Sequence, residues 1–177
     1  MSLLIISGSS RDNGNTEILA EEAAKNYPGD VEWIHLRRHT IHQITDQRHS
    51  ENGFAHVEDD HAELIKKMVQ AETILFATPV YWYGMSGYMK TFVDRWSQAL
   101  RNPDIEFKQK MKNKPVYVLI CGGDRVNVKG IPLILQFQLI CEFMDMELKN
   151  YFIGEAKKPG DMLKEQNQLS QMKQFFK

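Results

Sequence analysis

Cysteine is scarce in this sequence, which contains only Cys121 and Cys141 among 177 residues. Two cysteines cannot form the disulfide framework that is typical of small secreted proteins, so we expect a reduced, cytoplasmic chain. No apolar run approaches the roughly 18 residues that a membrane-spanning helix requires. The apolar run at the N-terminus covers only Leu3–Ile6 and follows no basic residue. We therefore expect neither a signal peptide nor a membrane partner.

The sequence also lacks an excess of charge of either sign. It has 22 lysine and arginine residues against 23 aspartate and glutamate residues, so its formal net charge is −1. Because nucleic-acid-binding proteins usually carry a basic surface, we expect no nucleic-acid partner. With 42% apolar and 25% charged residues, the composition is that of a globular protein. The length is close to that of one average domain, and we interpret residues 1–177 as a single domain.

Short apolar runs alternate with segments of helical periodicity along the chain. Such runs are typical of strands that are buried on both faces, as in a parallel sheet. The pattern predicts five strands, at residues 3–6, 31–36, 73–77, 115–121 and 147–153. Helices are expected after residue 15, after residue 60, and over residues 88–100, 131–144 and 162–176. We therefore predict an α/β fold in which helices cover both faces of a parallel sheet.

Two of the predicted helix starts carry capping signals. Asn15 or Thr16 is a suitable N-cap for the first helix, and Asp60 and Glu63 have the spacing of a capping box. Residues 37–58 are polar and have no clear period. A loop of that length is unusual in a compact domain and is often functional.

The loop after the first predicted strand has the composition of an anion-binding site. It reads GSSRDNGNT from Gly8 to Thr16 and runs into the first helix. Hydroxyl groups, an arginine and the N–H groups at a helix N-terminus can together bind a phosphate. The loop has neither the lysine of a Walker A motif nor the G-x-G-x-x-G spacing. A plain strand-to-helix turn is the alternative interpretation.

Ligands of open α/β sheets bind beyond the carboxyl ends of the strands, so the loops after the third and fourth strands belong to the same region. The third-strand loop contains three consecutive aromatic residues, Tyr81, Trp82 and Tyr83. They suit a flat ligand, although a patch over the core or at an interface is the alternative. The fourth-strand loop, Cys121–Asp124, contains two glycines that permit close approach of a ligand, or form an ordinary turn. Together the three loops predict a ligand with a phosphate at one end and a planar heterocycle at the other.

The segments GSSRDNGNT and TPVYWYGMSGYMKTFVDRW resemble motifs of the NAD(P)H-dependent FMN reductases and quinone reductases. The order of strands and helices agrees with that family over nearly the whole chain. The resemblance implies a flavodoxin-like, doubly wound five-stranded parallel sheet in the order 2-1-3-4-5, with bound FMN. In the family the first loop holds the FMN phosphate, the aromatic loop lies along the isoalloxazine ring, and the fourth-strand loop contacts the far edge of the ring.

The resemblance assigns three groups of FMN-binding residues to this sequence. The phosphate group consists of Ser9, Ser10, Arg11, Gly14, Asn15 and Thr16, with Ser10 and Gly14 shaping the turn. The ring group consists of Pro79, Val80, Tyr81, Trp82 and Tyr83. The edge group consists of Gly122, Gly123 and Asp124. Arg37 and Arg38 are further candidates, for the 2′-phosphate of NADPH.

The resemblance implies an enzyme that passes hydride from NAD(P)H through FMN to a small acceptor, namely a quinone, a nitro or azo compound, or free flavin. Because the flavin supplies the chemistry, no side chain has to act as an acid or base. Tyr81 and Tyr83 are weak candidates for protonating or positioning the acceptor. Two alternatives stay open. One is a flavodoxin-type electron carrier, a class that is usually strongly acidic, unlike this chain; the other is a flavin-free binding or regulatory module.

We expect no metal site. Relatives of this type often carry cysteines in the loop after the second strand, and some hold an iron–sulfur cluster there. Residues 41–60 contain no cysteine, so the thiolates that such a cluster needs are absent. All six histidines lie between His35 and His61, but His35, His39 and His42 would suit zinc only within a helix. We interpret these histidines as solvated loop residues.

The predicted helix over residues 131–144 has two apolar stripes. The stripe expected to face the sheet consists of Leu133, Phe137, Ile140 and Met144. The second stripe, on a different face, consists of Leu135, Leu139 and Phe143. A helix that covers one face of a sheet needs only one stripe, and large exposed apolar patches are uncommon on monomers. We therefore expect a homodimer or a dimer of dimers, unless a neighbouring helix covers the second stripe.

Overall fold

The computed structural model describes all residues from Met1 to Lys177. Its one sheet is formed by five strands, namely β1 (Ser2–Ser7), β2 (Asp30–His35), β3 (Thr73–Pro79), β4 (Pro115–Gly122) and β5 (Glu147–Glu155). All neighbouring strands are parallel, and their order is β2-β1-β3-β4-β5. The predicted fold class and strand order are therefore confirmed. Every predicted strand is present and ends within two residues of its predicted bounds.

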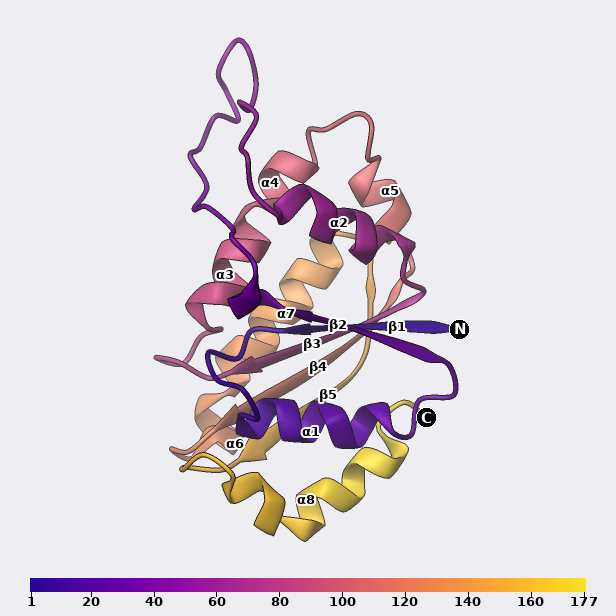
Figure 1. The fold of residues 1–177 in the computed structure, drawn as a ribbon, viewed down its shortest axis with the longest axis vertical. Coiled ribbons are helices and arrows are strands. Elements are labelled where there is room, and N and C mark those ends of the chain that lie inside the picture. Colours follow the sequence, from indigo (N-terminus) through magenta and orange to yellow (C-terminus); the bar gives the residue numbers. More distant parts are fainter.

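Helices cover both faces of the sheet (Figure 1). One face carries α1 (Asn15–Ala24), η2 (Asp161–Lys164), α8 (Gln166–Gln171) and η3 (Met172–Gln174). The other carries α2 (His61–Gln70), α3 (Gly87–Asp94), α4 (Trp96–Ala99), α5 (Phe107–Met111) and α7 (Ile131–Phe143). Alternate strand residues enter the two apolar clusters, as Leu4 and Ile6 do on one face and Leu3 and Ile5 on the other. The core is thus divided into two layers by a sheet that is buried on both sides.

Two predicted helices are broken into shorter pieces. The helix expected over residues 88–100 is interrupted between α3 and α4 at Arg95, whose guanidinium is held by Asp59 and by the carbonyl of His42. The helix expected over residues 162–176 is divided into η2, α8 and η3. Asn15 fixes η2 against α1, because its amide bonds the carbonyl of Lys158 and the N–H of Met162. The chain turns after η2, and Met172 and Phe175 then pack on the face of the sheet that α1 covers.

Neither expected side-chain cap is formed, although Asp60 is the N-cap residue of α2 as expected. α1 begins at Asn15 with Gly14 as its N-cap residue, and no side chain caps it. At the start of α2, the Asp60 side chain does not cap the helix, because its carboxylate accepts a hydrogen bond from the N–H of Thr40 over 2.8 Å. The N–H of His61 is bonded instead by Asp59, over 3.1 Å. Both carboxylates therefore also hold the preceding loop in place.

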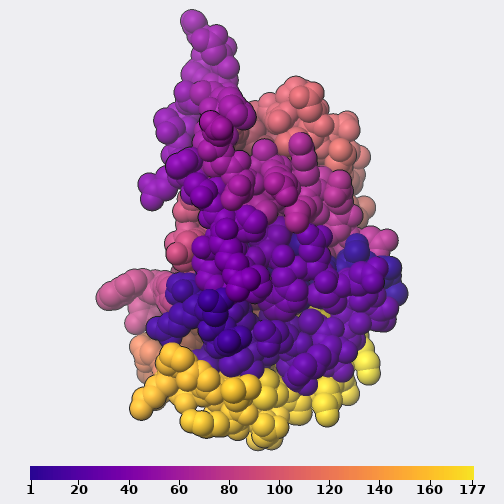
Figure 2. Space-filling view, in the orientation of Figure 1, coloured from indigo at the N-terminus to yellow at the C-terminus, as the bar shows by residue number.

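The connections at the carboxyl ends of β1, β3 and β4 lie together on the left of Figure 1. Two short helices occur at this edge, η1 (Leu36–Arg38) after β2 and α6 (Val126–Lys129) after β4. Residues 39–60 form no helix or strand, and Figure 2 shows part of this segment as a projection at the top of the molecule. The loop expected over residues 37–58 is therefore confirmed except at Arg37 and Arg38, which belong to η1. The loop between β3 and α3 forms a smaller projection on the left. No helix has the length and apolar character that crossing a membrane would require.

Candidate flavin site

The loop between β1 and α1 closes on itself through Ser9. Its Oγ donates to the carbonyl of Arg11 over 2.9 Å and accepts from the N–H of Arg11 over 3.2 Å. A Cβ at Gly14 would lie 2.8 Å from this Oγ, which is closer than van der Waals contact allows. Gly14 thus lets the loop wrap tightly around the hydroxyl. Ser9 shapes the turn, which is the role that the family resemblance assigned to Ser10.

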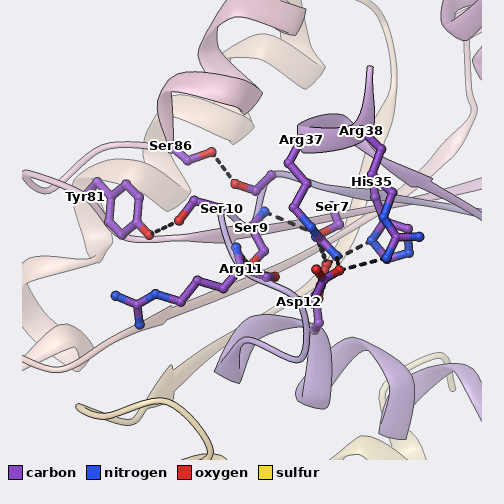
Figure 3. A network of polar contacts seen from close by, with 12 residues as sticks. Ser7, Ser9, Ser10, Arg11, Asp12, His35, Arg37, Arg38, Tyr81 and Ser86 are labelled. Carbon is purple, nitrogen blue, oxygen red and sulfur yellow. Dashed lines mark hydrogen bonds and ion pairs between the residues drawn. The ribbon is translucent and has the colours of Figure 1, made fainter. Parts of the chain in front are cut away.

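The first turn of α1 presents N–H groups that no side chain satisfies. α3 differs, because Ser86 Oγ accepts from the N–H of Met89 over 3.2 Å and caps it. Arg11 is exposed, and Figure 3 shows its guanidinium extending away from Asp12 toward the side of the loop where Tyr81 lies. Unsatisfied helix N–H groups beside an arginine without a partner fit the phosphate end of FMN.

Two hydrogen bonds connect the phosphate loop to the segment that follows β3 (Figure 3). Ser10 Oγ lies 2.7 Å from Tyr81 Oη. Ser86 Oγ donates to the carbonyl of Gly8 over 2.6 Å. The first of these bonds is exposed and the second is buried, so the two loops are joined both at the surface and in the interior. The predicted phosphate-binding and ring-binding segments therefore form one continuous edge.

Trp82 and Tyr83 lie at the tip of a tight turn with an unfavourable backbone conformation. Tyr81 and Gly84 exchange both of their backbone hydrogen bonds, each over 3.0 Å. Between them φ is 48° at Trp82 and 66° at Tyr83. Such turns favour Asn and Gly, and the left-handed conformation costs other residues about 1–2 kcal/mol each. Because the indole of Trp82 is also 96% exposed, this turn has the character of a binding element rather than of a packed loop.

A cavity of about 190 Å³ separates the aromatic loop from the loop that follows β4. Residues from both loops line it, including Val80, Tyr83, Gly122 and Gly123. Lys129 also lines it, forms an ion pair with Asp124, and places its Nζ 5.6 Å from the centroid of the Tyr83 ring. The structure thus brings the ring group and the edge group of predicted residues to one cavity.

Sequence reasoning missed a partly buried ionic network beside the phosphate loop. The carboxylate of Glu17 accepts from Ser7 Oγ over 2.8 Å, lies 2.9 Å from His35 Nδ1, and bonds the guanidinium of Arg37. Arg37 also bonds Asp12 of the phosphate loop. The only feature of the sequence that could have indicated this network is Glu17, which directly precedes the buried apolar residues Ile18 and Leu19. Its partner lies 20 residues further along the chain.

Asn15, Arg37 and Arg38 have contacts with other residues of the protein, and Thr16 remains available. Both polar atoms of the Asn15 amide hold the segment after β5, through Lys158 and Met162. Arg37, whose side chain is 9% exposed, is occupied by two carboxylates and is not free for a 2′-phosphate. The Arg38 side chain is 61% exposed but pairs with Asp12 over 2.7 Å. Thr16 lies in the first turn of α1, and its hydroxyl has no hydrogen-bond partner in the protein.

The cysteines do not fit a reactive thiol or an iron–sulfur cluster. Cys121 and Cys141 belong to apolar clusters on opposite faces of the sheet. Burial raises the pKa of each thiol to about 12, so neither is a thiolate near neutral pH. No group of three or more His, Cys, Asp or Glu side chains is arranged to hold a metal ion.

Comparisons with known proteins point to one family. The family model described as NADPH-dependent FMN reductase matches residues 1–135. YwqN of Bacillus subtilis, named as an NAD(P)H-dependent FMN-containing oxidoreductase, is 44% identical over 178 residues, which cover 100% of this chain and 97% of YwqN. An iron–sulfur flavoprotein of Methanocaldococcus jannaschii is 35% identical over 129 residues, covering 71% of this chain and 64% of that protein. The structure of the Trp repressor binding protein from Bacillus subtilis matches with a TM-score of 0.79 and 37% identity, and covers 99% of this chain and 97% of that one.

The family model spans more than half of the chain, and the Bacillus subtilis relative spans all of it. The resemblance stated from the sequence motifs is therefore confirmed. So are the enzyme class, an NAD(P)H-dependent FMN oxidoreductase, and the cofactor FMN with NAD(P)H as co-substrate. The chain belongs to the NADPH-dependent FMN reductase family.

Proposed function

We propose that this protein passes hydride from NAD(P)H through bound FMN to a small acceptor such as a quinone, a nitro or azo compound, or free flavin. FMN supplies the hydride chemistry when bound, and the chain binds and orients it. Arg11, Thr16 and the first turn of α1 hold the phosphate. The loops Pro79–Tyr83 and Gly122–Asp124 hold the ring. The observation that carries this assignment is the Ser10–Tyr81 hydrogen bond, which joins the phosphate loop to the aromatic loop.

We further propose that both substrates use the same exposed side of the site in turn. The aromatic tip is open to solvent, with Trp82 96% and Tyr83 49% exposed. One open side cannot hold NAD(P)H and an acceptor against the same ring together. Steady-state kinetics with NAD(P)H and a quinone therefore test the proposal. Parallel double-reciprocal lines support it, and intersecting lines would contradict it.

A second cavity, of about 420 Å³, favours neutral acceptors. It adjoins the flavin site at Ser10 and Tyr81, and Tyr88, Gln43 and His39 also line it. No carboxylate, lysine or arginine contributes to its wall. A wall with hydrogen-bonding groups but without carboxylate, lysine or arginine side chains suits an aromatic carbonyl compound better than an anion. The test compares kcat/KM for a neutral naphthoquinone and its sulfonate, and equal values would contradict the preference. The wall chemistry and the net charge of −1 also favour an enzyme over an acidic electron carrier.

We propose that the active protein is a homodimer, or a dimer of dimers, that forms through α7. No other helix covers the second apolar stripe, where Leu135, Leu139 and Phe143 are 51%, 56% and 63% exposed. An apolar groove of about 470 Å³ runs beside this stripe between α4 and α7. A partner helix would remove both features from water. Light scattering at micromolar concentration measures the assembly, and a mass near 20.6 kDa would contradict the proposal.

A further inference from the structure

Glu17 places a negative charge close to the helix turn that we assign to the phosphate. It lies in the first turn of α1, and its side chain is only 3% exposed. Burial by itself raises the pKa of Glu17, but hydrogen bonds from Arg37, Ser7 and His35 outweigh burial and lower it. Glu17 is therefore ionised near neutral pH. Without a compensating charge, this carboxylate would repel a phosphate bound at the same turn.

Arg37 supplies the compensating charge and connects two parts of the site. One Nη of its guanidinium bonds Glu17 in α1, and the other bonds Asp12 in the phosphate loop. Figure 3 shows the side chain of Arg37 directed toward Asp12. Its Nε is buried and has no partner, so the two carboxylates alone fix its orientation. Arg37 itself lies in η1, beyond the end of β2. A residue outside the loop therefore holds the loop against the start of the helix.

The three arginines near this loop have different roles. Arg11 has an exposed guanidinium without a protein partner, so it is free for a ligand. Arg38 is exposed and shares Asp12 with Arg37. The Arg37 side chain is mostly buried and both of its Nη atoms are committed to Glu17 and Asp12, so it cannot act as a direct phosphate ligand. Any effect of Arg37 on FMN binding must therefore be indirect, through the residues that Arg37 contacts.

We propose that Arg37 is a positioning residue for the FMN phosphate, which acts by neutralising Glu17 and by fixing Asp12. The two arginines, Arg37 and Arg38, balance the two carboxylates, Asp12 and Glu17, so these four charges cancel. Arg11 and the helix N-terminus then present a net positive charge to the phosphate. Without Arg37, the network carries a net negative charge beside the phosphate. This inference rests on the phosphate placement proposed above.

The test compares FMN with riboflavin, which has the same ring and lacks the phosphate. Both ligands are titrated into the apo-protein, and the ratio of their dissociation constants measures the preference for the phosphate. In Arg37→Met we expect this preference to fall about 10- to 100-fold, the range for a lost charged hydrogen-bond network. Riboflavin affinity should change less than about threefold. A comparable loss for both ligands would show that Arg37 only supports the fold, and would overturn the proposal.

A second substitution tests whether charge neutralisation is the reason. In the double variant Arg37→Met with Glu17→Gln, no unpaired carboxylate remains at residue 17. We expect this variant to regain at least about tenfold of the lost preference, because the repulsion is removed. If the double variant is as poor as Arg37→Met, neutralisation of Glu17 is not the mechanism.

The variant Arg37→Lys keeps the charge but cannot bridge both carboxylates with one planar group. Its preference for FMN should lie between those of the wild type and Arg37→Met, with unchanged riboflavin affinity. Circular dichroism shows whether each variant folds. If Arg37→Met does not fold, Arg37→Lys decides: a preference lowered about threefold or more supports the proposal, and an unchanged preference contradicts it.

Arg11→Met separates this inference from the placement on which it rests. If it leaves the preference for FMN unchanged, the phosphate binds elsewhere, and both the placement and the role of Arg37 are wrong. If Arg11→Met lowers the preference and Arg37→Met does not, the placement stands and only the positioning role is overturned.

Discussion

Tyr81 Oη lies 2.7 Å from Ser10 Oγ, and this contact joins the aromatic loop after β3 to the phosphate loop after β1. The bond lies at the surface, so it contributes little to folding. Its consequence is that the two ends of the proposed FMN site keep a fixed separation. A ligand that contacts both loops then binds to a site that is already formed.

Tyr81→Phe removes this bond and keeps the ring. We expect FMN binding to weaken by about 0.5–1.5 kcal/mol, the usual contribution of one hydrogen bond, with no change in thermal unfolding. Tyr88→Phe is the matched control, because Tyr88 is also exposed but has no hydrogen bond to the phosphate loop. Equal effects of the two substitutions would show that the Ser10–Tyr81 contact does not organise the site.

Thr16→Ala should weaken FMN binding by about 1–3 kcal/mol, because it removes a hydroxyl that would bond a charged phosphate. Asn15→Ala is the control one residue earlier. The Asn15 amide is committed to Lys158 and Met162, so this variant should lose stability and retain FMN affinity. Titration of the apo-variants and thermal unfolding give the two readouts. The reverse pattern would assign the phosphate contact to Asn15.

Trp82→Asn should raise the free energy of unfolding while it weakens FMN binding. Asn tolerates the positive φ at residue 82 better than Trp does, so it should relieve part of the cost of about 1–2 kcal/mol that this conformation has for Trp. The lost indole removes a surface against which a flat ligand can stack. Chemical denaturation and FMN titration measure the two effects. A variant that is less stable than the wild type would show that Trp82 is not held in a strained conformation.

His61 should make the protein acid-sensitive well above the pH at which carboxylates protonate. It is buried, and burial together with the positive charge of Arg95 lowers its pKa to about 4. Between the unfolded value of about 6.5 and about 4, the unfolded chain binds a proton that the folded chain does not, so stability falls as pH falls. The loss amounts to about 3 kcal/mol over that window.

Denaturant unfolding at several pH values measures this loss. His61→Leu should remove most of the slope, whereas the control His56→Leu, at an exposed position, should retain it. The paired carboxylates Glu17 and Asp59 have lowered pKa values, so their contributions are lost only below the unfolded value of about 4. An unchanged slope in His61→Leu would assign the acid sensitivity to other groups.

Leu139→Glu should convert the proposed dimer into a monomer, because it places a charge in the middle of the exposed stripe on α7. Its side chain is already 56% exposed, so the monomer itself should remain folded. Light scattering with circular dichroism measures both properties. Glu142→Gln, on the same helix outside the stripe, is the control. A folded Leu139→Glu protein with the wild-type mass would exclude α7 as the interface.

The sheet could be predicted from sequence because each strand is a short apolar run such as Leu3–Ile6, and the parallel order followed from the family motifs. The helix ends could not be predicted in the same way. Asp60 and Asn15 have the chemistry of caps, but both side chains bind distant backbone groups instead. Competition between local caps and tertiary contacts is not visible in the local sequence.

In the candidate site, too, some features are visible in the local sequence and others depend on tertiary contacts. The loops that we propose for the ligand are continuous motifs, so Arg11 and Tyr81 could be selected as candidates from the sequence. The network of Glu17, Arg37 and Asp12 joins residues from a helix, a later turn and a loop. No spacing rule connects them, because the contacts exist only after β2 has paired with β1. The left-handed turn at Trp82 was equally hidden, since its residues are not those that such turns favour.

Anaerobic addition of NAD(P)H to the FMN-loaded protein tests the central claim most directly. We expect the apo-protein to take up FMN, and about one equivalent of NAD(P)H to bleach the visible absorption of the bound flavin. A neutral quinone should then restore that absorption. Failure to take up FMN, or a bound flavin that NAD(P)H does not bleach, would contradict the account.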